Sequence, residues 1–235
     1  MAHTKKHRFN KHQKSKTPQK TMASKVNINI LYEQSVQCVE SEIDFVDETF
    51  QKLRGRKAAL LREDFCGTAN TSCEWIRRRK TNKAIAVDLN EEVLTWGREH
   101  KVSKLTDAQA KRITLINDNV MSADTGEADT ALAMNFSYWT FEDRPTMIKY
   151  FKGIYERLVD DGIFFLDAFG GYEAYQEMRE RTEHDKFTYK ESAIEIKDGS
   201  LRMDLLEYLQ ICIGQYVHCH ALMPTDRLCV HCHAL

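Results

Sequence analysis

Short, largely apolar runs recur along the chain and alternate with stretches in which apolar residues have helical spacing. The runs lie at residues 58–61, 84–89, 112–120, 129–137 and 163–169. Such runs are typical of parallel strands that are buried on both faces. Strands that alternate with helices form an α/β fold. The pattern therefore predicts a doubly wound, mostly parallel sheet with helices on both faces.

Further elements are predicted on either side of this region. Between residues 30 and 53, apolar positions recur mostly every three or four residues, which predicts one or two helices before the first strand. After the fifth strand, a helix is predicted over residues 172–183, and Asp198-Gly199 predicts a hairpin turn within residues 193–205. Beyond residue 206 the pattern fails, so we expect the last strand of the sheet to be missing or poorly formed.

Three segments of unlike composition divide the chain. Residues 1–24 contain seven Lys or Arg and no acidic residue, which predicts a disordered basic tail. The alternative is an arm that contacts RNA phosphates. Residues 25–205 are predicted to form one domain, and residues 206–235 an atypical tail that contains Cys and His. Over the whole chain 34 Lys and Arg balance 35 Asp and Glu, so net charge indicates neither a nucleic-acid nor a membrane partner.

Cysteine usage and hydropathy indicate where the protein works. No apolar run approaches the roughly 18 residues that a membrane span needs, and the first residues lack the apolar segment of a secretory signal. The seven cysteines are an odd number and are scattered, which does not suggest a disulfide framework. We therefore expect a cytoplasmic protein. Its oligomeric state is not predicted.

The turn after the first predicted strand carries the most specific pattern, EDFCGTA at residues 63–69. Gly67 allows the backbone to turn tightly and to approach a ligand closely, and the helix that follows presents unpaired N–H groups at its first turn. A carboxylate at Glu63 or Asp64 disfavours a phosphate in this turn and favours a cationic group such as an amine. The alternative interpretation is an ordinary strand-to-helix turn.

EDFCGTA resembles motif I of the class I S-adenosylmethionine (SAM) dependent methyltransferases, whose common form is an acidic residue, two variable positions and Cys-Gly-Thr-Gly. Phe65 and Ala69 stand where two of the motif's glycines usually are, which predicts a more crowded loop. The resemblance covers residues 30–185. It implies a Rossmann-like sheet, SAM as the cofactor and direct transfer of the sulfonium methyl group to a substrate nucleophile.

Side chains at the ends of the predicted strands complete the expected cofactor site. Asp88 ends the second strand 25 residues after Glu63, where dinucleotide and SAM sites place a carboxylate on the ribose hydroxyls. The alternative for Asp88 is a surface residue that flanks a helix. The resemblance implies that Asp118, with Asn119, meets the adenine. The full set of cofactor-binding residues expected in this way is Glu63, Phe65, Cys66, Gly67, Thr68, Asp88, Leu89, Asp118, Asn119, Val120, Asn135 and Phe136.

Aromatic residues are the candidates for substrate contact. Tyr138 and Trp139 follow the fourth strand, where they would form an apolar or cation-binding wall, and Tyr32 lies in the N-terminal helical segment. Packing in the core is the alternative for each. Methyltransferases that act on base or glutamine amines commonly carry Asn or Asp followed by Pro-Pro and an aromatic residue, and no such segment follows Asn135. This disfavours those acceptors. We favour a small molecule, and protein side chains and RNA remain open. No catalytic residue is assigned. Asp167 is expected to be a buried carboxylate within the fifth strand and is given no role, and a hydrogen-bonded strand-end residue is the structural interpretation.

The C-terminal tail raises the alternative of a metal site. It repeats VHCHAL at residues 217–222 and 230–235, and Cys229 and Cys232 have CxxC spacing. Zinc binds Cys and His tetrahedrally, but this spacing is irregular and no second CxxC pair exists. No metal is therefore predicted.

Two other functions remain open. An NAD-dependent oxidoreductase shares the topology but would carry GxGxxG in the first turn. A non-catalytic cofactor-binding or RNA-binding protein of the same fold is the second alternative.

Overall fold

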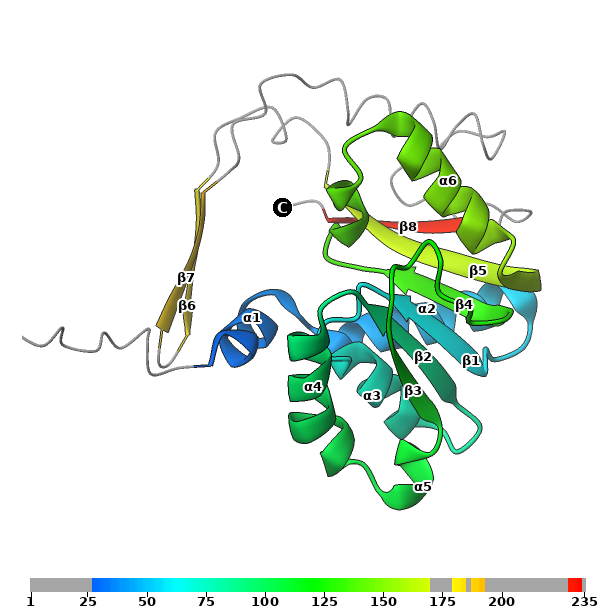
Figure 1. Ribbon diagram of the computed structural model, residues 1–235, viewed down its shortest axis with the longest axis horizontal. Coiled ribbons are helices and arrows are strands. Elements are labelled where there is room, and N and C mark those ends of the chain that lie inside the picture. Colours follow the sequence, from blue (N-terminus) through cyan, green and yellow to red (C-terminus); the bar gives the residue numbers. More distant parts are fainter. Residues whose placement is uncertain (1–26, 170–178, 185–186, 193–227, 234–235) are drawn as a thin grey trace, which may run out of the picture.

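The computed structural model describes residues 27–169, 179–184, 187–192 and 228–233, and its centre is a six-stranded sheet (Figure 1). The strands are β1 (Leu60–Asp64), β2 (Lys83–Asp88), β3 (Ile113–Asn117), β4 (Ala128–Ala133), β5 (Leu158–Phe169) and β8 (Leu228–His233). Their order is β3-β2-β1-β4-β5-β8, and every neighbouring pair is parallel. The predicted parallel sheet is confirmed.

Helices cover both faces of the sheet, as predicted. They are α1 (Ile28–Val36), α2 (Val39–Arg54), α3 (Asn70–Arg78), α4 (Glu91–His100), α5 (Asp107–Ala110) and α6 (Arg144–Tyr155), with short 3-10 turns η2 (Val102–Lys104) and η3 (Ser137–Thr140). The pair α1 and α2 confirms the predicted N-terminal helices. None of the helices in the described part of the chain is long and apolar enough to cross a membrane.

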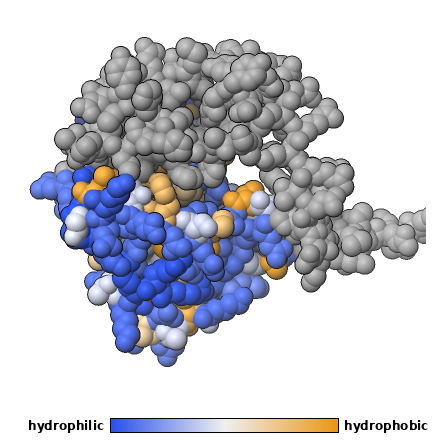
Figure 2. Space-filling model, turned by 180° about the vertical axis from the view of Figure 1, so that it is seen from behind, coloured by the Kyte–Doolittle hydropathy of each residue, from blue (hydrophilic) through white to orange (hydrophobic). Residues whose placement is uncertain are grey.

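Successive residues of the central strands point into two separate apolar cores. In β5, Ile163 and Phe165 pack in one core with residues of α2 and α3, whereas Phe164 and Leu166 pack in the other core with residues of α6. Because both faces are covered, neither face of these strands is exposed to solvent, and this explains why the sequence shows largely continuous apolar runs. The outer surface seen from behind in Figure 2 is largely hydrophilic over the described residues.

The C-terminal third differs from the prediction in two places. Residues 179–183, predicted to end a helix, belong to strand β6 (Arg179–His184), which pairs antiparallel with β7 (Phe187–Ser192). Pairing between strands overrides helix propensity, which is a weak determinant. The sheet also has a last strand: β8, from the Cys/His-containing tail, pairs with the edge of β5 and satisfies its backbone groups. The predicted turn at Asp198-Gly199 lies outside the described residues.

A buried ion pair joins β1 to the segment between β3 and β4 and to α6. Arg62 and Asp64 are 1% and 2% exposed, and Arg62 Nε donates to Asp64 Oδ1 over 2.7 Å. The same guanidinium donates to the Val120 carbonyl (2.6 Å) and to Thr125 Oγ1 (2.8 Å). The Tyr150 hydroxyl donates to Asp64 Oδ2 over 2.8 Å. This network holds the end of β1 against α6 and against the segment that follows β3.

Removing one member of the ion pair should destabilise the fold more than replacing both. Asp64→Ala leaves a buried guanidinium without its carboxylate, which we expect to lower the free energy of unfolding by about 3–5 kcal/mol. The double variant Arg62→Met/Asp64→Leu should lower it less, because neither charge is then buried. Urea denaturation of the three proteins tests this. A double variant as unstable as Asp64→Ala would show that packing, not the unpaired charge, decides the loss.

Candidate functional site

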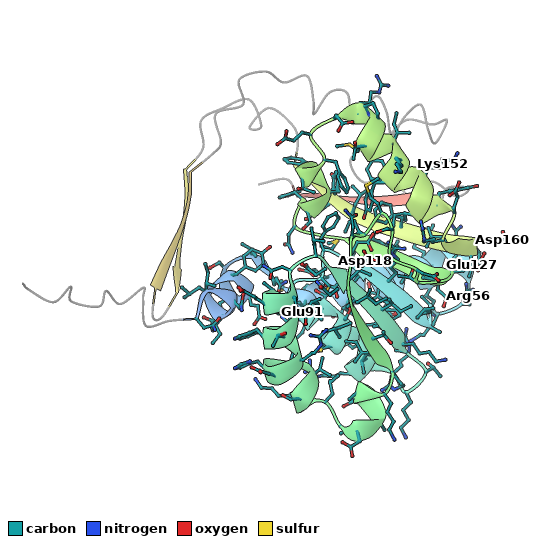
Figure 3. All side chains as sticks on the ribbon, in the orientation of Figure 1. Arg56, Glu91, Asp118, Glu127, Lys152 and Asp160 are labelled. Carbon is teal, nitrogen blue, oxygen red and sulfur yellow. The ribbon has the colours of Figure 1, made fainter. Side chains whose placement is uncertain are left out.

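The candidate site lies at the carboxyl ends of β1, β2, β3 and β4. Strands that run parallel end at one edge of the sheet, and the strand order changes direction between β1 and β4. Open α/β sheets bind ligands beyond the carboxyl ends of the strands at such a switch point. Figure 3 shows Asp118 and Glu91 toward this edge, whereas Arg56, Glu127 and Asp160 lie toward the opposite edge. The EDFCGTA segment at residues 63–69 therefore lies at the edge of the sheet where this topology binds ligands.

The loop of residues 65–69 has the backbone of a glycine-rich turn, although Gly67 is its one glycine. Phe65, Gly67 and Ala69 have φ angles of 56°, 52° and 57°, all in the left-handed region. For a residue with a side chain this conformation costs roughly 1–2 kcal/mol. The ring of Phe65 packs against Phe141 and Tyr150, with centroids 5.9 and 5.8 Å away. The Phe65 side chain is therefore accommodated by packing against other aromatic rings, and the backbone keeps the conformation of the tight turn.

Asp88 fixes this loop to the end of β2. Its Oδ2 accepts the N–H of Gly67 over 2.8 Å, and its Oδ1 accepts the N–H of Asn90 over 2.8 Å. The N–H of Cys66 donates to the Val87 carbonyl over 3.0 Å. Each carboxylate oxygen can accept more than one hydrogen bond. The geometry therefore gives Asp88 a structural contact and leaves its carboxylate chemically able to accept from hydroxyl groups.

Glu63 faces the start of α3 rather than the loop. It is 7% exposed, and its Oε2 accepts the backbone N–H of Ser72 over 2.9 Å and also the Ser72 hydroxyl. A carboxylate at a helix N-terminus satisfies unpaired N–H groups and interacts favourably with the dipole. Burial nevertheless raises the pKa of Glu63 from its ordinary value of 4.5 to about 7, although the bonds from Ser72 oppose the shift.

Gly97 in α4 permits a close approach to the loop that the sequence analysis did not identify. A Cβ at this position would lie 2.5 Å from the carbonyl oxygen of Thr68 and 2.9 Å from its carbonyl carbon. Only glycine leaves room for the backbone of the loop at this point. The sequence feature that could have indicated this contact is an isolated glycine within a helical pattern, because such a glycine often permits close packing.

Helix α1 contacts the loop through polar side chains. The Thr68 hydroxyl donates to Glu33 Oε1 over 2.6 Å, and Lys101 forms an ion pair with Oε2 of the same carboxylate. Asn70 Nδ2 donates to Gln37 Oε1 over 3.1 Å. No residue of α1 is buried. This helix is therefore held beside the candidate site by hydrogen bonds and charge, and not by an apolar core.

The residues expected to meet the adenine form a turn after β3. Asp118 Oδ1 accepts the N–H of Asn119 over 2.7 Å and the Ser122 hydroxyl over 3.1 Å. Asn119 Oδ1 accepts the N–H of Met121 over 2.9 Å. Both Asp118 and Asn119 are exposed. Their carboxylate and amide thus order the turn and remain accessible from solvent.

The other candidates divide into accessible and buried side chains. Leu89, next to Asp88, is 71% exposed, and Tyr32 in α1 is 49% exposed. Trp139 is half-buried. Val120 and Tyr138 are 6% and 0% exposed, so their side chains belong to the core. Of the predicted substrate contacts Tyr138 and Trp139, only Trp139 is accessible, and the ring of Phe136 beside it is also half-buried.

The turn after β4 is held by Asp167 of β5. Asn135 and Phe136 have φ angles of 57° and 54°, and their N–H groups donate to Asp167 Oδ2 (2.7 Å) and Oδ1 (2.9 Å). The Tyr138 hydroxyl donates to the Asp167 carbonyl over 2.8 Å. The rings of Phe136 and Trp139 stack with centroids 5.1 Å apart. The sequence indicated no role for Asp167, and the structure shows that it binds the turn after β4 through both its carboxylate and its backbone carbonyl.

Cysteine chemistry and metal ligation find little support in the described residues. Cys38, Cys66 and Cys73 are free, and burial raises the pKa of the Cys66 thiol well above its ordinary value, which keeps it protonated. Within the described part of the chain no group of three or more His, Cys, Asp or Glu side chains could hold a metal ion. The side chains of the zinc alternative, Cys229 and Cys232, lie outside the part described.

Two solved structures share the fold with good overlap. An S-adenosylmethionine-dependent methyltransferase from Clostridium acetobutylicum ATCC 824 matches with a TM-score of 0.54 and 18% identity, over 67% of this chain and 63% of that one. The glycopeptide N-methyltransferase MtfA matches with a TM-score of 0.52 and 15% identity, over 80% and 87% of the two chains. A second MtfA structure, complexed with SAM, matches with a TM-score of 0.49 and 15% identity, over 67% and 66%.

These likenesses establish the fold and nothing narrower. No protein-family model and no curated protein matches the sequence. The chain spans about two thirds of the length of the Clostridium enzyme and of the MtfA complex. The chain has the class I methyltransferase fold, as the resemblance of EDFCGTA implied.

A methyl group at position 97 should separate α4 from the loop. In Gly97→Ala the new Cβ meets backbone that cannot move aside cheaply, so we expect a loss of about 1–3 kcal/mol in unfolding free energy. The matched control is Gly153→Ala in α6, where the nearest atom is the flexible end of Arg157 at 3.1 Å. That variant should gain up to about 1 kcal/mol from helix propensity. Equal stability of the two variants in urea denaturation would contradict the close approach.

The buried carboxyl of Glu63 should make stability depend on pH. The pKa of Glu63 in the folded state, about 7, exceeds its ordinary value of 4.5. The protonated carboxyl therefore contributes fully to the free energy of unfolding below about pH 4.5, and this contribution is lost as the pH rises to about 7. The shift corresponds to roughly 3 kcal/mol. Glu63→Gln does not titrate, so the difference in unfolding free energy between wild type and variant should change over this range. Parallel pH profiles in urea denaturation would count against a buried titrating carboxyl.

Proposed function

We propose that this chain binds SAM at the carboxyl edge of β1 and β2 and transfers its methyl group to a substrate nucleophile. The observation that carries the proposal is the loop of residues 65–69, which keeps three left-handed residues and hydrogen-bonds through Gly67 to Asp88. The fold, shared at TM-scores above 0.5 with two methyltransferases, supports it.

The residues present fit such a cofactor. Among the described residues, a Cβ built on Gly67 would meet only Val93 Cγ1, at 3.9 Å, so they leave room on this side of the turn. The carboxylate of Asp88 suits two ribose hydroxyls, and exposed Leu89 offers an apolar surface beside it. Asp118 and Asn119 present a carboxylate and an amide that suit an exocyclic amine. When bound, SAM would supply an electrophilic methyl group on its sulfonium.

The remaining residues of the proposed site lie in or next to the loops that follow β1, β3 and β4. Phe65, Cys66 and Thr68 form the turn beside the proposed amino-acid end, and Glu63 holds the start of the helix that follows it. Val120 lies in the segment after β3, and Asn135 and Phe136 lie in the turn after β4. Their task is to hold the donor and the acceptor in line. Positioning of this kind supplies effective molarities of up to about 10⁸ M. A neutral amine acceptor needs no general base, and we assign none.

We favour a small-molecule acceptor. Support comes from the sequence after β4, which lacks the Pro-Pro-aromatic segment of enzymes that methylate base or glutamine amines. The accessible rings at this position, Phe136 and Trp139, offer an apolar or cation-binding surface. Tyr32 of α1 is a further accessible ring for substrate contact.

Cofactor titration tests the proposal directly. Isothermal titration with SAM, S-adenosylhomocysteine and NAD should show binding of the first two. In Asp88→Ala the affinity for SAM should fall roughly 10- to 100-fold, because hydrogen bonds to a charged group each contribute about 1.5–3 kcal/mol. Asp107→Ala, an exposed carboxylate at the start of α5, is the control and should bind as wild type does.

Two results would contradict this proposal. Binding of NAD without SAM would favour the oxidoreductase alternative, which shares the carboxylate at the end of the second strand. Unchanged SAM affinity in a folded Asp88→Ala variant would remove Asp88 from the site. The class of acceptor follows from incubation with methyl-labelled SAM and a fractionated cell extract. Label in the low-molecular-mass fraction supports a small molecule, whereas label in RNA would favour a role for the basic tail.

A further inference from the structure

Asp167 makes three contacts to one short turn. Its two carboxylate oxygens accept the consecutive N–H groups of Asn135 and Phe136, and its backbone carbonyl accepts the hydroxyl of Tyr138. The carboxylate is 2% exposed, so these bonds form away from water, where an unpaired charge is costly. One residue of β5 therefore determines the backbone of the turn that follows β4.

This turn has a backbone conformation that is uncommon for Phe136, whereas Asn adopts it more readily than most residues. Asn135 and Phe136 are both left-handed, and a pair of adjacent side-chain-bearing residues rarely adopts that form. Such strain persists only where the surroundings fix it, and it is concentrated at functional sites. The consequence here is the stack of Phe136 on Trp139, located beyond the end of β4, one of the two strands that flank the switch point.

We propose that Asp167 is a positioning residue for the methyl acceptor. It acts through the turn of residues 135–139, whose Phe136 and Trp139 rings form the acceptor surface. The inference rests on the proposed methyl transfer and deepens it, because it assigns the placement of the acceptor to a residue that need not touch either ligand. An error of about 1 Å in such placement can reduce a rate by about 10²-fold.

The chain offers a matched control in which similar chemistry has no link to the site. Asp129, at the amino end of β4, accepts the consecutive N–H groups of Ala59 and Leu60 over 2.9 and 2.8 Å. It also pairs with Arg56. Neither Ala59 nor Leu60 is left-handed, and this edge of the sheet is opposite the candidate site. We therefore expect loss of this carboxylate to affect stability and to leave the acceptor turn unchanged.

The test compares Asp167→Asn with Asp129→Asn. An amide has one acceptor oxygen, so Asp167→Asn leaves one of the two N–H groups of the turn without its partner. Each variant is titrated with SAM, and its methyl transfer is measured against dilutions of the extract fraction that wild type labels. For Asp167→Asn we expect an acceptor KM raised about tenfold and a SAM Kd within twofold of wild type. For Asp129→Asn both values should be unchanged.

A milder variant keeps the test decisive if Asp167→Asn does not fold. Tyr138→Phe removes only the hydroxyl bond to the Asp167 carbonyl, and we expect it to raise the acceptor KM about threefold. Unchanged acceptor KM in the folded variants, or an equal rise in Asp129→Asn, would show that Asp167 serves stability alone. A wild type that binds no SAM refutes the proposed function itself. SAM binding without any labelled fraction refutes the transfer and, with it, this role of Asp167.

Discussion

The hydrogen bond from Gly67 N–H to the Asp88 carboxylate is the contact on which the candidate site depends. It joins the loop after β1 to the end of β2, and the other oxygen of the same carboxylate holds the start of α4 through Asn90. Helix α4 in turn approaches the loop so closely at Gly97 that no side chain fits. The Asp88 carboxylate and the absence of a side chain at Gly97 therefore set the relative positions of the loop, β2 and α4.

Carboxylates that accept backbone N–H groups recur at the ends of the central strands. Glu63 holds the start of α3, Asp88 the loop after β1, and Asp167 the turn after β4. A loop rich in glycine would reach left-handed conformations at little cost. Here Phe65, Ala69, Asn135 and Phe136 adopt them with side chains, and acidic residues from neighbouring strands supply compensating hydrogen bonds for some of them. The same device serves stability at the amino edge through Asp129.

Much of the fold was predictable because its signals are local. Apolar runs and helical spacing located the first five strands and the helices α1 and α2, and EDFCGTA located the turn after β1. Strand β6 was not predictable because its residues, RERTEH, include no apolar residue that would indicate a strand, although its partner β7 follows directly in the chain. Strand β8 was not predictable because it forms through pairing with β5, which is distant in the sequence. The burial of Tyr138, and the contacts that Asp167 makes to a turn 32 residues earlier, depend on the same kind of long-range packing.

The sequence by itself determined the α/β class, the parallel sheet and the edge at which its polar strand ends collect, since hydrophobic periodicity and strand direction suffice for these. Only the tertiary structure decided what each carboxylate does. Glu63 turned toward α3, Asp88 toward the loop and Asp167 toward the turn after β4 because the N–H groups they bind come from other elements of the fold. The sequence gives the type of each side chain, but the hydrogen-bond partners of that side chain depend on which segments lie beside it in the folded protein.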